Sequence, residues 1–212
     1  MNTELANLFV KHQCDKAQKH QYHLVYGPHF ELLKNEPINI LEVGVWKAAS
    51  TKALLEYFPS ATFYGIDIFD RVTIESTGIS DNKRVNFMKA DSTDEDLPNK
   101  IREAWGPIKF DIIIDDGLHI PDAMLATFKN CFDFLNENGT YFIEDVWPTH
   151  KMSDEEIKKY SWLHYSDGSR KPKYEAEKTK ALYNCLNNYK LKEYDNSMRT
   201  GNRDSFIFEV RR

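Results

Sequence analysis

Two pairs of acidic residues and a histidine stand at the ends of two apolar runs in the middle of this 212-residue chain. Asp115 and Asp116 end the run FDIIIDD, and His119 follows three residues after Asp116; Glu144 and Asp145 end the run TYFIED. Four crowded carboxylates repel one another unless a cation or protons neutralise them. Their oxygen atoms suit a hard cation such as Mg²⁺. The sequence therefore predicts a cation site wherever the fold brings both pairs together.

The elements around these acids predict that convergence. Each apolar run is typical of a buried strand. The residues between the runs predict a helix, because apolar side chains recur at three- and four-residue steps: Met124, Leu125, Phe128, Phe132 and Leu135. Asn138-Gly139 is expected to stop this helix before TYFIEDV begins the second strand. A right-handed strand–helix–strand crossover then places both strand ends at the same edge of a parallel sheet.

Acids at strand ends can also be solvated loop residues or helix caps. That interpretation would suffice for Asp115 alone or for Glu144 alone. Two acidic pairs at matching ends of consecutive strands, with His119 beside one of them, favour the cation site instead.

An earlier strand, INILEV, leads into a turn and a helix through the pattern ExGxxxAxS, formed by Glu42, Gly44, Ala48 and Ser50. A glycine at a strand end lets a ligand approach the backbone closely, and the turn leads to a helix N-terminus. The dinucleotide fingerprint GxGxxG needs a second glycine two residues after Gly44, where this chain has Trp46. The sequence therefore disfavours pyrophosphate binding at this turn.

Two further strands end in polar residues that suit a nucleoside. Asp67 ends the run ATFYGID, 25 positions after Glu42, where an acid can accept hydrogen bonds from both hydroxyls of a ribose. Asp91 and Ser92 follow the run RVNFMKA and are expected to meet an adenine edge. Each acid alone could be a loop residue or a helix cap, but together they predict a nucleoside pocket.

The rest of the chain is expected to surround this core within one domain of residues 1–212. Residues 1–34, with the stretch HQCDKAQKHQYHLVYGPHF, predict a helical cap over the site; its histidines would permit a separate metal site, but no ligand spacing repeats. Residues 35–146 form the predicted cofactor- and metal-binding core, including a helix over 93–105. Residues 147–175 are rich in aromatics and either cover an acceptor or pack as an ordinary surface segment. Residues 176–212 predict a helix and two strands.

Composition indicates the structural class of the protein and its expected location in the cell. A hydrophobic fraction of 41% supports the core of one α/β domain. The net charge of -5, with lysines and glutamates interleaved, argues against nucleic-acid binding. Three widely spaced cysteines without a CxxC pair indicate neither a disulfide framework nor a zinc site, and the chain shows no apolar signal segment or membrane span. We expect a soluble, cytoplasmic protein, and the sequence leaves a homo-oligomer open.

The chain resembles a known family through DKAQKHQYHLVY, LEVGVWKAAS, YGID, DIIIDDGLH and YFIEDV. These motifs are similar to those of class I S-adenosylmethionine-dependent methyltransferases. Within that class they resemble the metal-dependent sugar O-methyltransferases typified by macrocin and mycinamicin O-methyltransferase, with DDGxH and IED as the specific pair. A further resemblance is to the rhamnose O-methyltransferases that decorate surface glycans of large algal viruses.

The resemblance implies a Rossmann-like α/β fold, with a seven-stranded, mostly parallel sheet, an antiparallel last strand and helices on both faces. It also implies that Asp116, Glu144 and Asp145 hold Mg²⁺ and that His119 is the catalytic base. The chain departs from the family pattern at Ala48 and Ala49, where glycines are usual, and at Ser92, where a longer polar residue is common.

The predicted activity is methyl transfer from S-adenosylmethionine to a hydroxyl of a sugar such as rhamnose, on a glycan or glycoside. His119 and Asp116 are the predicted catalytic residues. The cofactor is expected to contact the strand-end residues Glu42, Gly44, Ser50, Asp67, Asp91, Ser92 and Asp115. A catechol-type O-methyltransferase is the alternative enzyme, and a binding module that has lost catalysis is the alternative of another class. The intact acids and His119 argue against the latter.

Overall fold

The predicted seven-stranded, mostly parallel sheet is confirmed in the computed structural model, which describes residues 3–148, 152–153, 155, 162–164, 170–172 and 176–212. The strand order is β3-β2-β1-β4-β5-β9-β8. The strands are β1 (Asn39–Val43), β2 (Thr62–Asp67), β3 (Val85–Lys89), β4 (Phe110–Asp115), β5 (Leu135–Ile143), β8 (Lys190–Asp195) and β9 (Phe206–Arg211). β1 to β5 run parallel, and β9 lies antiparallel to both β5 and β8.

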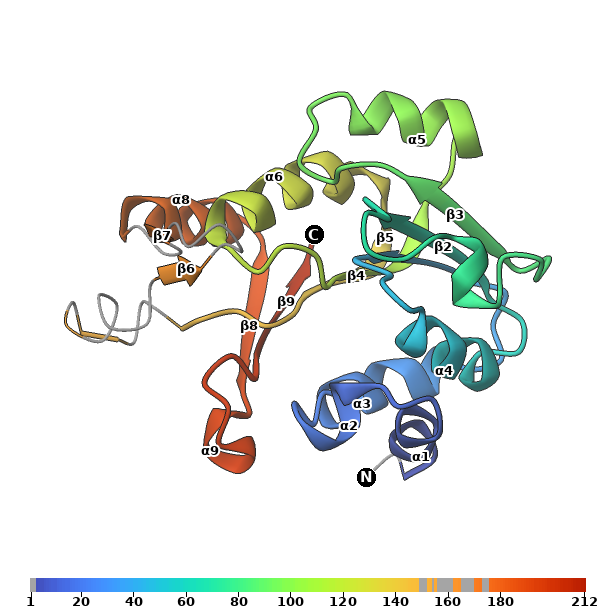
Figure 1. Ribbon diagram of the computed structural model, residues 1–212, viewed down its shortest axis with the longest axis horizontal. Helices are drawn as coiled ribbons and strands as arrows, with labels where there is room; N and C mark the ends of the chain where they lie inside the picture. Colours follow the sequence, from blue (N-terminus) through green and yellow to red (C-terminus); the bar gives the residue numbers. More distant parts are fainter. Residues whose placement is uncertain (1–2, 149–151, 154, 156–161, 165–169, 173–175) are drawn as a thin grey trace.

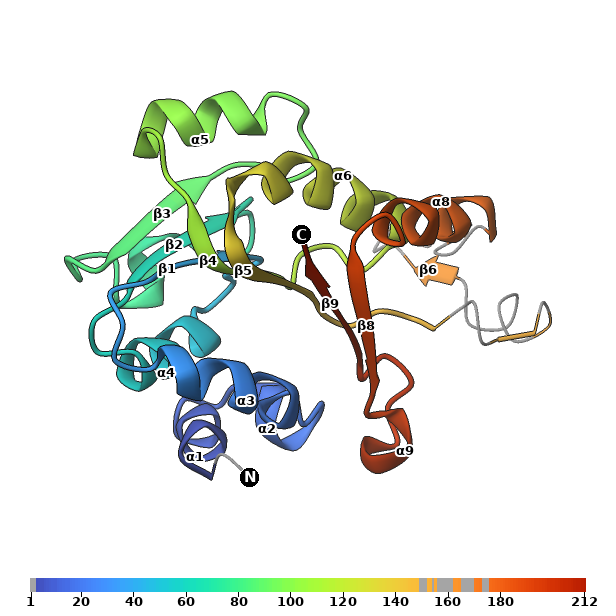
Figure 2. The same ribbon diagram turned by 180° about the vertical axis from the view of Figure 1, so that it is seen from behind.

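Helices cover both faces of the sheet (Figure 1), and the reverse view shows the same two layers (Figure 2). One layer contains α1 (Thr3–Lys11), α2 (Asp15–Gln18), α3 (His23–Leu33) and α4 (Ala49–Tyr57). The other contains α5 (Leu97–Trp105), α6 (Pro121–Cys131) and α8 (Ala176–Leu186). The short elements are the 3₁₀ turns η1 (Glu75–Thr77) and η2 (Phe132–Phe134), the hairpin β6 (Trp162–His164) and β7 (Arg170–Pro172), and α9 (Ser197–Thr200).

Alternate side chains along each central strand build one core on either face of the sheet. In β1, Ile40 belongs to the core beneath α1–α4, whereas Leu41 belongs to the core beneath α5, α6 and α8. Phe142 and Tyr141 of β5 divide between the two cores in the same way. Burying such a side chain contributes roughly 1.5–3 kcal/mol, and a strand buried on both faces explains the continuous apolar runs of β4 and β5.

Two sequence-predicted boundaries are wrong. Asn138-Gly139 does not stop a helix, because α6 ends at Cys131 and both residues lie within β5. The pairing of β5 with β4 jumps from Phe110–Leu135 to Ile112–Thr140, so the Asn-Gly pair occupies an irregular bulge that a turn-forming sequence accommodates. The helix expected over 93–105 begins at Leu97, with Pro98 in its first turn.

The strand register brings the predicted site residues to one edge of the sheet. Val43 pairs with Asp115, and Asp115 pairs with Ile143. The ladder continues one residue further, because the Asp116 N–H donates to the Val43 carbonyl and the Glu144 N–H donates to the Asp115 carbonyl, both at 2.9 Å. Asp116 and Glu144 therefore lie at equivalent levels on neighbouring strands, and the two acidic pairs are offset by one residue. No helix in the described part of the chain has the length and apolar character to cross a membrane.

Candidate active site

A cavity of about 400 Å³ opens beyond the carboxyl ends of β1, β2, β3 and β4. Five of the predicted site residues line it: Gly44, Asp67, Asp91, Ser92 and Asp116. Trp46 and Arg71 line it as well, and neither was assigned to a site from the sequence. In open α/β sheets ligands bind at this edge, where the strand order reverses, and β1 and β4 flank that point here.

Gly44 lets the loop after β1 lie directly against the loop after β4. Its φ is +86°, and a Cβ built on it would lie 2.0 Å from the Asp116 backbone oxygen. A side chain at this position would therefore meet rigid backbone rather than an adjustable neighbour. Gly44 places Asp116, which lines the cavity, immediately beside the turn that follows β1.

Asp67 connects the loop after β1 to the loop after β2 at the mouth of the cavity. One carboxylate oxygen accepts a hydrogen bond from the Trp46 N–H at 2.8 Å, and the other accepts one from the Phe69 N–H at 2.7 Å. Trp46, Ala48 and Phe69 all have positive φ values, between 43° and 58°. Such conformations cost about 1–2 kcal/mol for residues other than glycine. Ala48 stands where glycine is usual in the family that the chain resembles. Its backbone is left-handed in this structure.

Asp91 and Ser92 lie on the far wall of the cavity, after β3. Asp91 accepts hydrogen bonds from the N–H and the hydroxyl of Thr93, at 2.8 and 2.7 Å. The Ser92 hydroxyl hydrogen bonds to that of Thr127 in α6, at 2.8 Å. Both side chains are therefore fixed by their own loop or by the neighbouring helix while they line the cavity.

Three predicted cofactor residues lie beneath the cavity rather than on its wall. Glu42 is buried and accepts hydrogen bonds from the hydroxyls of Ser50 and Thr51 in α4. Burial raises the pKa of Glu42. Asp115 is also buried, and burial raises its pKa to about 7 although the Gly117 N–H donates to its carboxylate. Glu42 and Ser50 tie β1 to α4, and Asp115 supports the loop that carries Gly117.

Asp116 joins the cavity to a second group of polar side chains. Its Oδ1 atom lies 3.0 Å from His119 Nε2, and its Oδ2 atom lies 2.6 Å from the Lys16 ammonium. Burial opposes ionisation of Asp116, but Lys16 and the hydrogen bond with His119 outweigh this effect and lower its pKa. Asp116 is therefore a carboxylate with one oxygen toward each partner.

Glu144 is enclosed by the N-terminal helices. Lys16 lies 2.5 Å from its Oε2 atom, and the Tyr26 hydroxyl donates to its Oε1 atom. Lys16 and Tyr26 are themselves buried. Both oxygens of Glu144 thus have partners supplied by α2 and α3, and burial raises the pKa of its carboxyl group.

Asp145 is held by Tyr22 in a left-handed conformation, with φ at 52°. The Tyr22 hydroxyl donates to Asp145 Oδ1 at 2.6 Å and accepts a hydrogen bond from the Asp145 N–H at 3.1 Å. Asp145 Oδ2 lies 3.6 Å from His119 Nδ1. The two ring nitrogens of His119 therefore face two carboxylates, one from each acidic pair.

The electrostatics of this group favour an added cation. Burial lowers the pKa of His119, but Asp116 and Asp145 outweigh burial and raise it to about 9. Burial, reinforced by the charge of Asp116, also raises the pKa of Asp145. Lys16 and a protonated His119 supply two positive charges against three acids, Asp116, Glu144 and Asp145, so the group is still short of positive charge.

The donor atoms fit a divalent cation. Asp116, His119 and Asp145 each offer one ligand atom, and these atoms lie within 4.8 Å of one another. Carboxylate oxygens suit Mg²⁺, and an added imidazole nitrogen also suits transition metals. The structure thus brings together two of the three predicted metal ligands with His119. Glu144, the third, is turned toward Lys16 and Tyr26.

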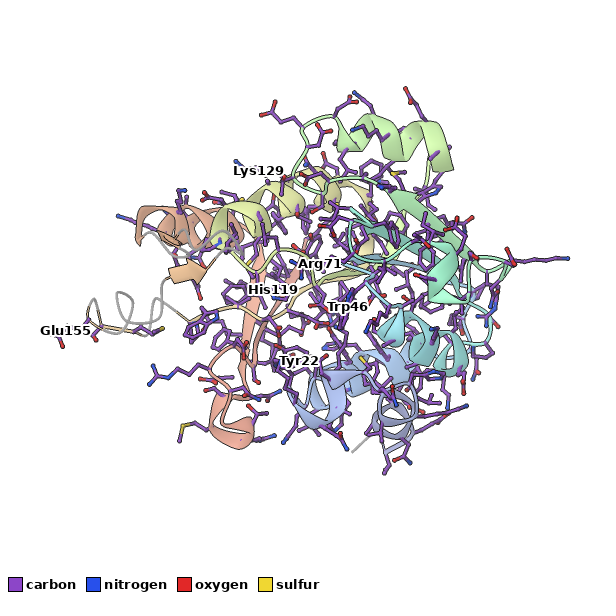
Figure 3. The ribbon with its side chains drawn as sticks, viewed as in Figure 1. Tyr22, Trp46, Arg71, His119, Lys129 and Glu155 are labelled. Carbon is purple, nitrogen blue, oxygen red and sulfur yellow. The ribbon has the colours of Figure 1, made fainter. Side chains whose placement is uncertain are left out.

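Figure 3 shows Trp46, Arg71 and His119 in the central part of the view and Tyr22 below them, at the N-terminal helices, whereas Lys129 and Glu155 lie toward the outside. Tyr22, Tyr26 and Lys16 contact the acids although the sequence assigned the N-terminal segment only a general covering role. A signal was available for the two tyrosines, which are four residues apart and so share one face of a helix, but not for Lys16. Of the aromatics expected over an acceptor, Trp162, His164, Tyr165 and His150 have side chains outside the described part of the chain.

Comparison with known proteins identifies the class of fold to which the sheet belongs. No protein-family model matches the chain. Among solved structures, the MycE methyltransferase from the mycinamycin biosynthetic pathway, in complex with Mg, SAH and mycinamycin VI, aligns with a TM-score of 0.66 and 23% identity, covering 98% of this chain and 54% of that one. The chain has the class I methyltransferase fold.

The curated proteins that are similar in sequence have names that specify a reaction. The mycinamicin VI 2''-O-methyltransferase of Micromonospora griseorubida is 31% identical over 132 residues, which are 59% of this chain and 31% of the relative. The 8-demethyl-8-alpha-L-rhamnosyl tetracenomycin-C 2'-O-methyltransferase of Streptomyces olivaceus is 32% identical over 155 residues, which are 68% of this chain and 39% of the relative. The resemblance predicted from the sequence is confirmed: the chain is homologous to the macrocin, mycinamicin and tetracenomycin sugar O-methyltransferases. The aligned segments span well under half of these relatives.

Proposed function

We propose that the protein transfers a methyl group from S-adenosylmethionine to a hydroxyl of a sugar, with the help of a divalent cation such as Mg²⁺. The observation that carries this proposal is the position of Asp116, which lines the cavity and also joins the group formed by His119, Asp145, Glu144 and Lys16. A cofactor cavity and a cation-binding group meet at this one carboxylate. The named relatives are O-methyltransferases of sugar-bearing compounds, and MycE was solved with Mg and SAH.

In this proposal the cavity holds the nucleoside part of the cofactor. Asp67 is placed at the tip of β2 to accept hydrogen bonds from ribose hydroxyls, because each of its oxygens has a lone pair beyond those used by Trp46 and Phe69. Asp91 and Ser92 face the base, and Gly44 lies near the methionine portion. Glu42, Ser50 and Asp115 shape the loops from below. The bound cofactor supplies an electrophilic methyl group on a sulfonium centre.

His119 is the proposed base, and Asp116 and Asp145 are the proposed cation ligands. A bound cation supplies charge stabilisation that makes a weakly acidic sugar hydroxyl easier to deprotonate. With the acids alone as neighbours, the raised pKa of about 9 keeps His119 protonated at neutral pH. A nearby dication opposes that protonation, so occupancy of the site favours the neutral imidazole that can accept a proton. Asp116 and Asp145 orient the ring through its two nitrogens.

The remaining parts of the proposal come from the sequence. Residues 1–34 are proposed to cap the site and residues 147–175 to cover the acceptor, and much of the second segment lies outside the described residues. A cytoplasmic location, a single domain and the absence of nucleic-acid binding stay predictions, as does Glu144 as a third metal ligand. Because the aligned segments span less than half of the curated relatives, the acceptor of the whole protein is also part of the proposal.

An acceptor screen tests the function. Purified protein, S-adenosylmethionine and Mg²⁺ would be incubated with rhamnosides, other deoxyglycosides and catechols, with S-adenosylhomocysteine release and product mass as readouts. We expect methylated glycosides and loss of turnover in EDTA. Methylated catechol alone would select the alternative enzyme. Cofactor binding without turnover on any acceptor would favour a binding module.

A further inference from the structure

Lys16 has an unusual environment for a lysine. Its side chain is 2% exposed, and its ammonium lies 2.6 Å from Asp116 Oδ2 and 2.5 Å from Glu144 Oε2. A buried ammonium is costly unless it is paired. Here it is paired twice, with an acid after β4 and an acid after β5. Lys16 is therefore a fixed positive charge at the point where the two strands end.

Lys16 and Tyr26 contact the acids from one side, and His119 contacts them from the other. On the enclosed side, Lys16 and Tyr26 occupy Asp116 Oδ2 and both oxygens of Glu144. On the other side, Asp116 Oδ1 and Asp145 Oδ2 face His119. A cation that used Glu144 would have to share or displace Lys16, because both cations need the same oxygen atoms. A cation held by Asp116 and Asp145 would still lie close to the Lys16 charge, because Lys16 contacts Asp116.

We propose that Lys16 is a built-in cation of this site: it holds Asp116 and Glu144 in place in the metal-free protein, and it competes with a divalent ion for them. The inference rests on the metal part of the proposed function. Lys16 is a positioning residue in this account, because it touches the acids and not the acceptor or cofactor. Its tether to α2 keeps its local concentration high, so the acids remain arranged before a metal arrives.

Lys16 is therefore expected to lower the affinity of the site for a divalent ion and to raise the stability of the metal-free protein. Without Lys16, Asp116, Glu144 and Asp145 would be crowded and partly buried, with His119 as the one cation beside Asp116 and Asp145 and no cation beside Glu144 among the described contacts. A divalent ion would then be the main means of neutralising them and would bind more tightly. With Lys16 present, the metal-free protein is stable, and the ion binds more weakly and reversibly.

The test compares Lys16→Met with wild type. Lys19→Met is the matched control, because Lys19 lies on the same segment and its pair with Asp15, at 3.5 Å, is half-exposed on both sides. Mg²⁺ titration calorimetry without cofactor should show affinity at least about tenfold tighter in Lys16→Met and unchanged in Lys19→Met. In EDTA, Lys16→Met should unfold at least about 5 °C lower than wild type, and Mg²⁺ should restore most of the loss.

Equal Mg²⁺ affinity in Lys16→Met and wild type, with equal stabilisation by Mg²⁺, would overturn the role of Lys16 while leaving the metal site standing. Absence of Mg²⁺ binding in both proteins would overturn the metal part of the proposed function together with the competition. Weaker Mg²⁺ binding in Lys16→Met would also overturn it, because Lys16 would then support the metal ligands rather than compete for them.

A second variant covers the case in which Lys16→Met does not fold. Lys16→Met combined with Glu144→Gln removes the buried charge from both partners, which is far less costly than removing one. A folded double variant supports Lys16 as the partner that neutralises Glu144. Failure of the double variant to fold would show that Lys16 does more for the fold than neutralise Glu144, and the inference would be rejected.

Discussion

At the scale of single residues, Gly44 is required by geometry and not merely by flexibility. A Cβ at Gly44 would lie 2.0 Å from the Asp116 backbone oxygen, whereas Gly78, with a φ of +72°, has no atom within 4 Å of its Cβ position. Both alanine variants would adopt an unfavourable positive φ. Only Gly44→Ala would also force two loops apart.

We therefore expect Gly44→Ala to lower the free energy of unfolding by roughly 2–5 kcal/mol, combining backbone strain with overpacking. Gly78→Ala, the matched control, should lose only about 1–2 kcal/mol, the cost of the left-handed backbone. Urea unfolding monitored by fluorescence measures both values. Similar losses in the two variants would show that the loops after β1 and β4 can separate without cost.

His119 gives a pH-dependent prediction for the metal-free protein. Its pKa in the folded protein is about 9, above the value of about 6.5 expected when unfolded. The folded state therefore binds this proton more tightly, and the resulting stabilisation is complete below about pH 6.5 and is lost as the pH rises through 9.

In EDTA, the difference in unfolding temperature between wild type and His119→Gln should shrink steadily between pH 6.5 and 9. Thermal denaturation at a series of pH values measures it. Saturating Mg²⁺ should flatten the dependence, because a dication disfavours the imidazolium. A difference that is constant over this range in EDTA would mean that Asp116 and Asp145 do not hold a charged His119.

At the scale of elements, the N-terminal helices are part of the site and not only a cover. Tyr22, at the start of α3, exchanges two hydrogen bonds with Asp145. The segment is anchored from the other side, because the Asn196 side chain donates to the carbonyls of His20 and Gln21. The loop after β8 and the loop after α2 thus fix Tyr22 against the end of β5.

Tyr22→Phe should release Asp145 from its left-handed conformation. The Asp145 N–H would lose its partner within a buried site, which costs about 1–3 kcal/mol, and Asp145 Oδ1 would be left with His20 Nδ1, at 3.4 Å. We expect lower stability and weaker Mg²⁺ binding, with S-adenosylhomocysteine affinity unchanged, because Tyr22 is not among the residues lining the cavity. Calorimetry with each ligand separates the two effects. An equal loss of both affinities would place Tyr22 at the cofactor cavity.

Elements with strong periodic patterns were predictable from the sequence, whereas contacts between distant segments were not. The runs of β1, β4 and β5 are apolar enough to reveal buried strands, and the helix between β4 and β5 predicts that these two strands run parallel with their ends at one edge. The bulge at Asn138-Gly139 escaped prediction because the same dipeptide suits a turn or an irregular strand. Lys16 escaped it because pairing across 100 residues, with Asp116, leaves no local spacing signal.

At the scale of the whole molecule, the proposed cofactor site and the proposed cation site lie side by side along one edge of the sheet. The cavity is built mainly from the ends of β1, β2 and β3, with Gly44, Asp67 and Asp91 on its walls. The cation-binding group belongs to the ends of β4 and β5 and to the N-terminal helices. Asp116 is common to both, and its carboxylate oxygens are directed to Lys16 and His119. Cofactor and metal should therefore bind largely independently.

The last prediction tests that independence and the role of Asp67 together. S-adenosylhomocysteine should bind with one site per chain, and EDTA should change its affinity by less than about threefold, because the acids proposed to hold the cation are not the acid proposed to face the ribose. Asp67→Ala should weaken binding at least about tenfold, since charge-assisted hydrogen bonds contribute roughly 1.5–3 kcal/mol each. Asp70→Ala, in the same cavity wall, is the control and should change little. Isothermal titration calorimetry of the three proteins, with and without EDTA, gives all six affinities. Unchanged affinity in folded Asp67→Ala would place the ribose elsewhere, and a large loss in EDTA would show that the cation organises the cofactor cavity as well as the acceptor side.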